Sequence, residues 1–329
     1  MNLTDLEGKK VLITGASGLI GKALVSALAL HNGEKPVKIF ALVRNEAKAR
    51  AVFSHLPCEV HYIVTDICEL EPKDMGIDYI IHGASMTASK DFVASPVEVI
   101  ESSYLGTKRI LEFAKVNPVK SLVYLSTMEV YGAPDTDEKI AEEHSTNLDT
   151  MHVRSSYPES KRLCENLCTA YAKEYNVPAK VVRLTQTFGK GVDYNDGRVF
   201  AEFARCVIEN RDIVLKTEGK TERNYLDVDD AVNAIYTVLT RGSTGEAYNA
   251  ANEDSYCTIY QMACMVAEKF GKGKIRVKIE RQNSEALGYA PTLKMNLSSK
   301  KLQALGWKAQ TSLEKTYEKM IEDMRKTKQ

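Results

Sequence analysis

Tyr157 and Lys161 are residue types whose spacing could support acid–base chemistry. They stand four positions apart at the start of a helical pattern that runs to about Tyr175, so they share one helix face. A phenol with an unperturbed pKa of about 10 is a poor base at neutral pH, and a nearby ammonium lowers that pKa because it favours the phenolate. The pair predicts a catalytic Tyr157 assisted by Lys161, although this spacing alone is common on protein surfaces.

Thr127 and Glu129 follow a predicted strand, which runs from Lys120 to Leu125 and continues into Ser126. Ligands of open parallel sheets bind outside the C-terminal ends of the strands, so this position suits Thr127 for chemistry. Glu129 lies two residues further on and has a carboxylate that could remove a proton. The alternative is that Glu129 only stabilises the loop.

The glycine-rich stretch from Lys10 to Gly21 has the pattern of a nucleotide-binding turn. A short apolar strand at 11–13 precedes three glycines at positions 15, 18 and 21. They allow in turn a sharp bend, the approach of a pyrophosphate, and close packing of the next helix on the strand. The free N–H groups at that helix start would face an anion. We therefore expect a dinucleotide to contact Gly15, Ser17, Gly18, Leu19, Ile20 and Gly21.

Three later segments complete the expected dinucleotide site. An acidic residue at the end of the second strand holds the ribose 2′-hydroxyl of NAD, whereas an arginine there suits the 2′-phosphate of NADP. Arg44 stands at this position and slightly favours NADP over NAD, which remains open. The alternative is that Arg44 is only a solvated charge in a loop. Asp66, followed by Ile67, could accept from the adenine amino group or cap the next turn. A turn of small residues would let the backbone pass beneath the cofactor: Gly83, Ala84 and Ser85.

Strands and helices alternate with short connections over residues 10–184, which predicts an α/β fold with a Rossmann-type, doubly wound parallel sheet. Beyond this point the alternation loosens, and the stretch from Gly219 to Asn224 is polar. We expect a dinucleotide-binding domain at 1–184, rejoined by about 226–249. A smaller α+β substrate lobe is expected at 185–225 and 250–329.

The composition argues against several classes of function. The 44 Lys+Arg residues balance 44 Asp+Glu residues, so bulk charge predicts neither a nucleic-acid nor a membrane partner. No apolar run has transmembrane length, and the polar start of the chain is not typical of a secretory leader. The seven cysteines are scattered, and Cys164 and Cys168 have no partners that would complete a metal set. We expect no metal site, and free thiols in a reducing cytoplasm.

Several motifs together resemble the extended short-chain dehydrogenase/reductases, and more narrowly the NAD-dependent, nucleotide-sugar epimerase/dehydratase family, over nearly the whole chain. The resemblance implies that Tyr157 is the acid/base, Lys161 its electrostatic partner and a ribose contact, and Thr127 a second hydroxyl on the sugar oxygen. The motifs are Thr14-Gly-Ala-Ser-Gly-Leu-Ile-Gly21, Asp78-x-Ile-Ile-His82, Gly106-Thr107, Ser126-Thr-Met-Glu-Val-Tyr-Gly132, Tyr157-Pro-Glu-Ser-Lys161, Arg183 with Thr187-Phe-Gly189, Arg223-Asn-Tyr-Leu-Asp-Val-Asp-Asp230 and Leu305-Gly-Trp307.

The resemblance also implies a nucleotide-sugar substrate, contacted by Ser126 and Gln186. Arg198 and Arg223 resemble phosphate clamps, since a guanidinium matches phosphate oxygens bidentately, or they are ordinary ion-pair residues. Within the family the likeness is strongest to UDP-glucuronate decarboxylases and sugar 4,6-dehydratases. However, Met128 stands where dehydratases often carry an Asp. The chain departs from the family pattern at further positions, so the pocket could hold a different sugar: Ser103, Gln186, Lys190 and Asp227.

The reaction implied by the resemblance is a hydride cycle. Tyr157 takes the proton of the C4 hydroxyl, the sugar is transiently oxidised at C4, and the hydride returns after decarboxylation, dehydration or epimerisation. Net NADPH-dependent carbonyl reduction is an alternative that Arg44 supports and that does not need Glu129. A non-catalytic dinucleotide sensor is another. The helices at about 97–116 and 158–175 fall where this family packs two subunits, so the resemblance also implies a homodimer.

Overall fold

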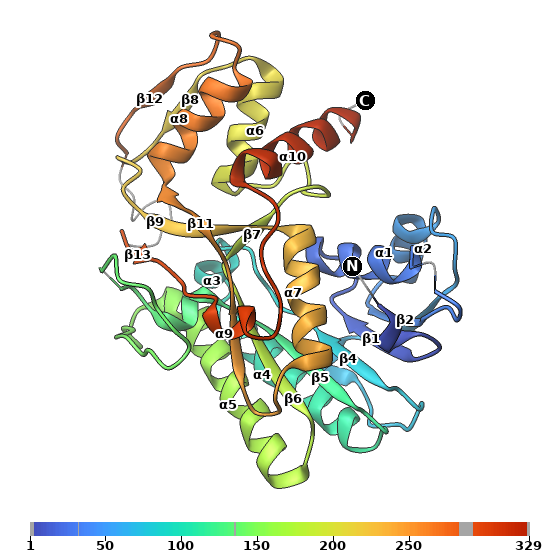
Figure 1. The fold of residues 1–329 in the computed structure, drawn as a ribbon. Helices are drawn as coiled ribbons and strands as arrows, with labels where there is room; N and C mark the ends of the chain where they lie inside the picture. Colours follow the sequence, from blue (N-terminus) through green and yellow to red (C-terminus); the bar gives the residue numbers. More distant parts are fainter. Residues whose placement is uncertain (1–2, 32, 135, 283–291, 328–329) are drawn as a thin grey trace.

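A parallel sheet of seven strands forms the centre of the molecule (Figure 1). The computed structural model describes residues 3–31, 33–134, 136–282 and 292–327. Along the sheet the strand order is β3-β2-β1-β4-β5-β6-β10, and every neighbouring pair is parallel. The strands are β1 (Lys10–Thr14), β2 (Lys38–Val43), β3 (Val60–Val64), β4 (Tyr79–His82), β5 (Ser121–Thr127), β6 (Ala179–Leu184) and β10 (Ala247–Ala250).

Helices cover both faces of this sheet, which is why its inner strands are continuous apolar runs. α1 (Leu19–Ala29), α2 (Glu46–Phe53) and α7 (Val228–Arg241) share one core with β1 and β2. α4 (Pro96–Lys115) and α5 (Ser156–Tyr175) lie side by side on the other face, in a second core (Figure 1). The prediction of an α/β, doubly wound parallel sheet is confirmed. Within the described ranges, no helix is both long and apolar enough to cross a membrane.

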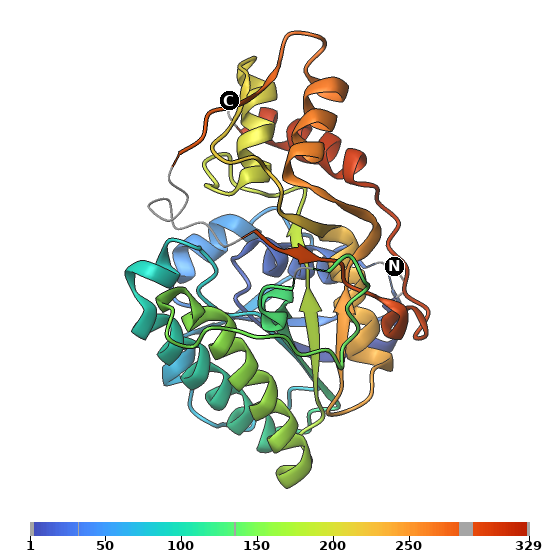
Figure 2. The same cartoon turned by 90° about the vertical axis from the view of Figure 1, so that its left-hand side faces the viewer.

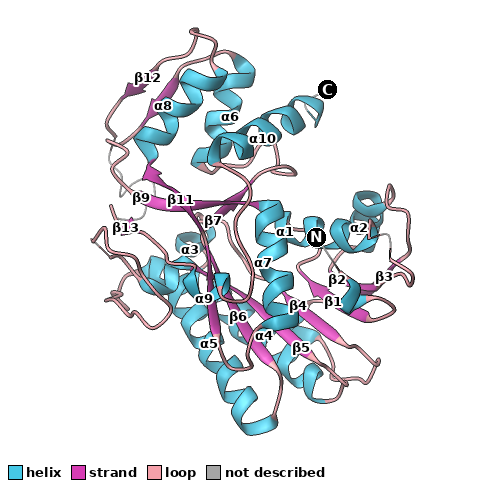
Figure 3. Cartoon of the chain, in the orientation of Figure 1, coloured by secondary structure: helices cyan, strands magenta, loops and turns pink. Residues whose placement is uncertain are grey.

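A smaller α+β unit stands beyond the C-terminal edge of the central sheet (Figure 2). Its helices pack around a core that includes Phe200 and Phe203, and Figure 3 shows the strands of a second sheet crossing between the two units. Its helices are α6 (Val199–Glu209), α8 (Ile259–Phe270) and α10 (Leu313–Thr327), and its strands are β7 (Gln186–Phe188), β8 (Ile213–Leu215), β9 (Glu222–Asp227), β11 (Asn252–Thr258), β12 (Val277–Ile279) and β13 (Lys294–Met295).

The chain passes between the two units more than once. After β9, helix α7 leads back to the central sheet, where β10 pairs with β6. Near the C-terminus α9 (Lys300–Gln303) lies beside β10, and Leu302 and Trp307 are buried in the same core as α1 and α7. The domain limits expected from the sequence stay a prediction, and residues 283–291 and 328–329 of the expected lobe lie outside the described residues.

One polar stretch contains the start of a strand. The residues from Gly219 to Asn224 are polar, and β9 begins among them, at Glu222. Asn224 is buried, and its Oδ1 accepts a hydrogen bond of 2.6 Å from the backbone N–H of Leu297. A polar side chain can lie inside a sheet when it is hydrogen-bonded. The partner comes from far along the chain, so local hydrophobic periodicity does not reveal this strand.

Replacing Gly21 by Ala should destabilise the fold, because the start of α1 packs backbone to backbone on the turn before it. An added Cβ would lie 2.2 Å from the carbonyl oxygen of Gly15 and 2.7 Å from Cα of Ala16. Overpacking of this kind lowers the free energy of unfolding by about 1–3 kcal/mol. Urea unfolding measures it, with Gly197→Ala as the control because nothing lies within 4 Å of a Cβ at that position. Equal stability of the two variants would contradict the close packing.

Candidate active site

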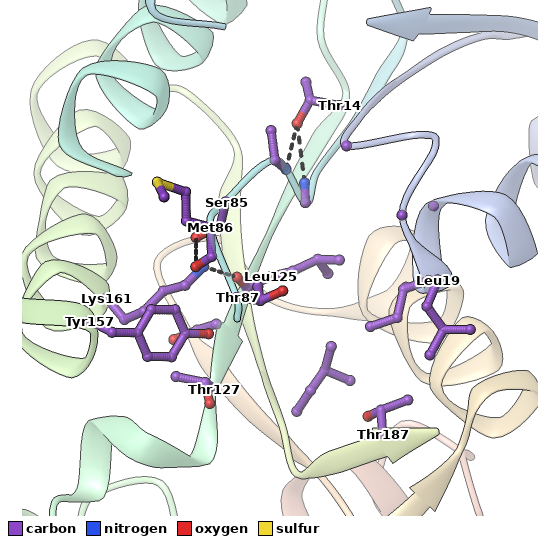
Figure 4. A pocket seen from close by; sticks show the side chains of 18 of the residues that line it. Thr14, Leu19, Ser85, Met86, Thr87, Leu125, Thr127, Tyr157, Lys161 and Thr187 are labelled. Atoms are coloured by element: carbon purple, nitrogen blue, oxygen red, sulfur yellow. Dashed lines mark hydrogen bonds between the residues drawn. The ribbon is translucent and has the colours of Figure 1, made fainter. Parts of the chain in front are cut away.

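A cavity of about 550 Å³ lies at the C-terminal ends of β1, β2, β4, β5 and β6. Figure 4 shows side chains from the N-terminal turn, from β5 and from α5 that line it together. The cavity brings together nearly all the residues that the sequence singles out: Gly15, Ser17, Gly18, Leu19, Ile20, Gly21, Arg44, Asp66, Ile67, Gly83, Ala84, Ser85, Ser126, Thr127, Glu129, Tyr157, Lys161, Gln186 and Arg198.

The glycine turn leaves the start of α1 open to the cavity. Gly15 has a φ of +68°, and a Cβ there would lie 2.8 Å from the backbone of Gly83 and Ala84. Gly18 is the N-cap residue of α1, so no N-cap side chain accepts a hydrogen bond from the N–H groups at the start of this helix. The first N–H groups of a helix have no partner within the helix and attract anions. The turn therefore has the form that a pyrophosphate requires.

Thr14 and His82 support the turn at Gly83 and Ala84, on which Gly15 packs. The sequence did not identify either of them as a site residue. Thr14 Oγ1 accepts hydrogen bonds from the backbone N–H groups of Gly83, at 3.2 Å, and Ala84, at 3.1 Å (Figure 4). It also lies 2.7 Å from His82 Nδ1. Burial lowers the pKa of His82 to about 3, so the imidazole is neutral at physiological pH. The signals in the sequence are the motifs that contain them, Thr14 at the start of the 14–21 motif and His82 at the end of the 78–82 motif.

Tyr157 lies in an apolar environment that opposes its ionisation. Its ring stacks on Phe92, with centroids 4.2 Å apart and planes 7° from parallel. Burial, and next the Glu129 carboxylate, raise the pKa of Tyr157, while a hydrogen bond with Thr127 lowers it. Phe92 belongs to the short helix α3 (Asp91–Ala94), which the sequence patterns did not predict.

The pKa of Tyr157 is raised in this structure, whereas its spacing with Lys161 predicts that it is lowered. Lys161 Nζ donates to the carbonyl oxygen of Leu125 at 2.9 Å and lies 5.8 Å from the centre of the Tyr157 ring (Figure 4). Burial lowers the pKa of Lys161 itself to about 8. Desolvation of the phenol, which spacing cannot reveal, is the largest cause of the raised pKa of Tyr157.

Thr127 and Glu129 stand together at the end of β5. Thr127 Oγ1 accepts a hydrogen bond of 3.3 Å from the backbone N–H of Glu129 and so caps the short 3-10 helix Met128–Tyr131. The Glu129 carboxylate accepts two hydrogen bonds from Arg154, at 2.9 Å from Nη1 and 3.3 Å from Nη2. Glu129 therefore lines the cavity while it is ion-paired.

The expected substrate residues divide into two groups. Ser126 and Gln186 line the cavity. The Ser126 hydroxyl already donates a hydrogen bond of 2.5 Å to Glu165 Oε1. Arg198 also lines the cavity, and Asp196 holds its guanidinium at distances down to 2.5 Å. Arg223 lies on β9 outside the cavity lining, and its buried Nε has no hydrogen-bond partner among the described residues.

Arg44 and Asp66, the residues expected around the adenosine, both line the cavity. Asp66 Oδ1 accepts from the backbone N–H of Cys68 at 2.9 Å, so its capping role is present. Arg44 is exposed and has no hydrogen bond or ion pair to any other described residue. Within the same ranges, no cluster of three or more His, Cys, Asp or Glu residues could hold a metal ion.

Comparison with known proteins gives the family. A family model for the NAD dependent epimerase/dehydratase family matches residues 11–251. The chain belongs to this family. Its relatives include an enzyme, UDP-glucuronic acid decarboxylase 1 of Xenopus tropicalis, which is 28% identical over 325 residues, or 98% of this chain and 74% of that protein.

Solved structures of epimerase/dehydratase-like enzymes share the fold. UDP-glucose 4-epimerase of Thermotoga maritima, solved with UDP-glucose, has a TM-score of 0.82 at 22% identity and covers 97% of this chain and 100% of that chain. dTDP-glucose 4,6-dehydratase of Bacillus anthracis, solved in complex with NAD, has a TM-score of 0.78 at 20% identity, with 97% of each chain covered. At this level of identity the likeness establishes the fold alone.

The buried position of Lys161 predicts an unusual titration. Its ammonium should lose its proton as the pH rises through about 8, whereas exposed lysines titrate at about 10.4. Burial also lowers the pKa of Lys180 to about 8. In a pH titration followed by side-chain NMR, two lysine signals should therefore change near pH 8, below the pH at which the exposed lysines titrate. Lys161→Met should remove one of them and Lys180→Met the other. A Lys161 signal that titrates with the exposed lysines would refute the assignment.

Proposed function

We propose that this protein is an enzyme that modifies nucleotide sugars by oxidising the sugar at C4 and then returning the hydride. The main observation in support is that one cavity is lined by the glycine turn together with Thr127, Tyr157 and Lys161. A pyrophosphate-binding turn beside a phenol and a hydroxyl suits hydride exchange between a dinucleotide and an alcohol. Membership of the epimerase/dehydratase family supports the same reading.

Each residue has a defined task in this proposal. Tyr157 accepts the proton of the C4 hydroxyl, Thr127 hydrogen-bonds the same oxygen, and Lys161 supplies positive charge beneath the tyrosine. The dinucleotide, when bound, accepts a hydride from C4 and gives it back. The neutral, buried phenol has to ionise for its task, so we expect the bound dinucleotide and sugar to favour the phenolate.

Decarboxylation is the outcome that the relatives favour. A keto group at C4 lets a carboxylate at C6 leave as carbon dioxide, and it also makes the C5 proton acidic enough for dehydration or epimerisation. The similarity to UDP-glucuronic acid decarboxylase 1 supports a uronate substrate. Gln186 and Arg198, which line the cavity, are the proposed contacts to the nucleotide sugar. Arg223 stays a predicted phosphate contact, and it lies outside the cavity lining.

Net reduction by NADPH is a second candidate, and Arg44 is the observation that favours it. Its guanidinium is exposed at the cavity and has no partner among the described residues, so a 2′-phosphate could pair with it. We therefore propose that Arg44 admits NADP, whereas the family name and the NAD-bound dehydratase structure support NAD.

The hydride cycle can be tested with the purified protein and UDP-glucuronate or UDP-glucose. We expect a product in NMR spectra without net change in dinucleotide redox state. Tyr157→Phe should lower kcat about 10²–10⁴-fold, because it removes the proton acceptor. Tyr175→Phe, an exposed tyrosine on the same helix, is the control.

Two results would separate the candidates. Stoichiometric consumption of NAD(P)H would contradict the cycle and support a reductase. Full turnover of a Glu129→Gln variant, together with this consumption, would strengthen that conclusion. Mass spectrometry of the dinucleotide released on denaturation tests Arg44 in the same preparation. Recovery of NAD alone would contradict its proposed part.

We also propose a homodimer built on α4 and α5. Both helices carry large apolar side chains on the surface, among them Val97, Ile100 and Leu163, which are 65%, 43% and 46% exposed. Apolar side chains that gather on two neighbouring helices are typical of an interface.

Replacing Ile100 by Glu should therefore convert a dimer into a monomer, because a charge in an apolar interface is costly. Light scattering after size-exclusion chromatography measures the mass. Val214→Glu, at a residue that is 40% exposed on β8 in the smaller unit, should leave the mass unchanged. A wild-type chain that runs as a monomer would refute the proposal.

A further inference from the structure

Arg154 lies directly before α5 and contacts two parts of the candidate active site without lining the cavity. It belongs to the 3-10 helix Val153–Ser155, and 15% of its side chain is exposed. Its Nη1 and Nη2 donate to the two carboxylate oxygens of Glu129. Its Nε is buried without an acceptor, so among the described residues Glu129 is its only hydrogen-bond partner.

The second contact of Arg154 is with the ring that holds Tyr157. Its guanidinium carbon lies 5.7 Å from the centre of the Phe92 ring, and the same ring stacks on the Tyr157 phenol with centroids 4.2 Å apart. The backbone carbonyl of Phe92 accepts a hydrogen bond of 3.1 Å from Ser156 Oγ. α3 is thereby tied to the start of α5, one residue before Tyr157.

We propose that Arg154 is a positioning residue, which orients the Glu129 carboxylate and, through Phe92, the Tyr157 ring as one unit. The inference rests on the proposed function for its catalytic consequence. A bidentate guanidinium–carboxylate pair fixes the plane of the carboxylate as well as its distance. A stacked aromatic pair has a preferred offset and so restricts how the phenol can turn.

The arrangement limits how the Glu129 carboxylate can face the substrate. Each carboxylate oxygen accepts one hydrogen bond from Arg154 and keeps a second lone pair, so the pair fixes the directions in which a proton could reach Glu129. Loss of Arg154 should therefore disturb any step that uses this carboxylate, either as a base or as a fixed negative charge.

A double-mutant cycle with Arg154→Ala and Glu129→Gln tests the unit in the full chain with its own bound dinucleotide. Arg154→Ala should lower kcat about 100-fold, as expected for displaced catalytic groups, with little change in KM. In the Glu129→Gln background the same change should cost less than about 10-fold, because the partner is already altered. Arg50→Ala, which breaks the exposed Arg50–Glu46 pair, is the matched control and should leave both constants unchanged.

Equal losses in the two backgrounds would overturn the proposal, since Arg154 would then act independently of Glu129. A crystal structure of Arg154→Ala provides a test that needs no substrate. We expect the Glu129 carboxylate to rotate and the Phe92–Tyr157 stack to shift. Unchanged positions of both would overturn the proposal, whereas failure of the wild-type chain to convert any nucleotide sugar would count against the proposed function alone.

Discussion

Backbone-to-backbone contact beneath the glycine turn is the constraint on which the rest of the site depends. At Gly15 and Gly21 there is no room for a Cβ, because the neighbouring atoms belong to the backbone of Gly83, Ala84, Ala16 and Gly15 itself. The close contact brings the open end of α1 over the ends of β1 and β4, where Thr14 holds the turn at Gly83. Every other element of the site is placed relative to this edge of the sheet.

Desolvation determines the electrostatics at the other end of the cavity. Burial raises the pKa of Tyr157, so the phenol is neutral at pH 7. Burial lowers the pKa of Lys161 to about 8, which leaves most of its ammonium protonated at pH 7. A neutral phenol is a poor base. We expect the charges of the bound dinucleotide and sugar to favour the phenolate, which ties the proposed chemistry to the presence of both ligands.

The parts of the site that follow from local patterns could be predicted from the sequence. The glycine spacing and the i, i+4 pair are each encoded within a dozen residues, and the ends of parallel strands meet at one edge, so Thr127, Tyr157 and Gly18 could be assigned to one pocket. The contacts that tune these residues join distant positions. Glu129 contacts Arg154, and Phe92 contacts Tyr157, through the packing of distant segments, which the spacing of residues in the sequence does not indicate.

Arg223 shows the converse. Its motif suggests a pocket residue, but its strand β9 pairs with β11 in the second sheet, and Arg223 lies outside the cavity lining.

We propose that a hydride leaves the sugar and returns to it within one turnover. Stopped-flow absorbance of the reduced nicotinamide, recorded after the dinucleotide-loaded protein is mixed with its nucleotide sugar, tests this proposal. We expect a transient rise in that absorbance, which decays to the starting level as product forms. A signal that rises or falls to a lasting new level in proportion to product would contradict it.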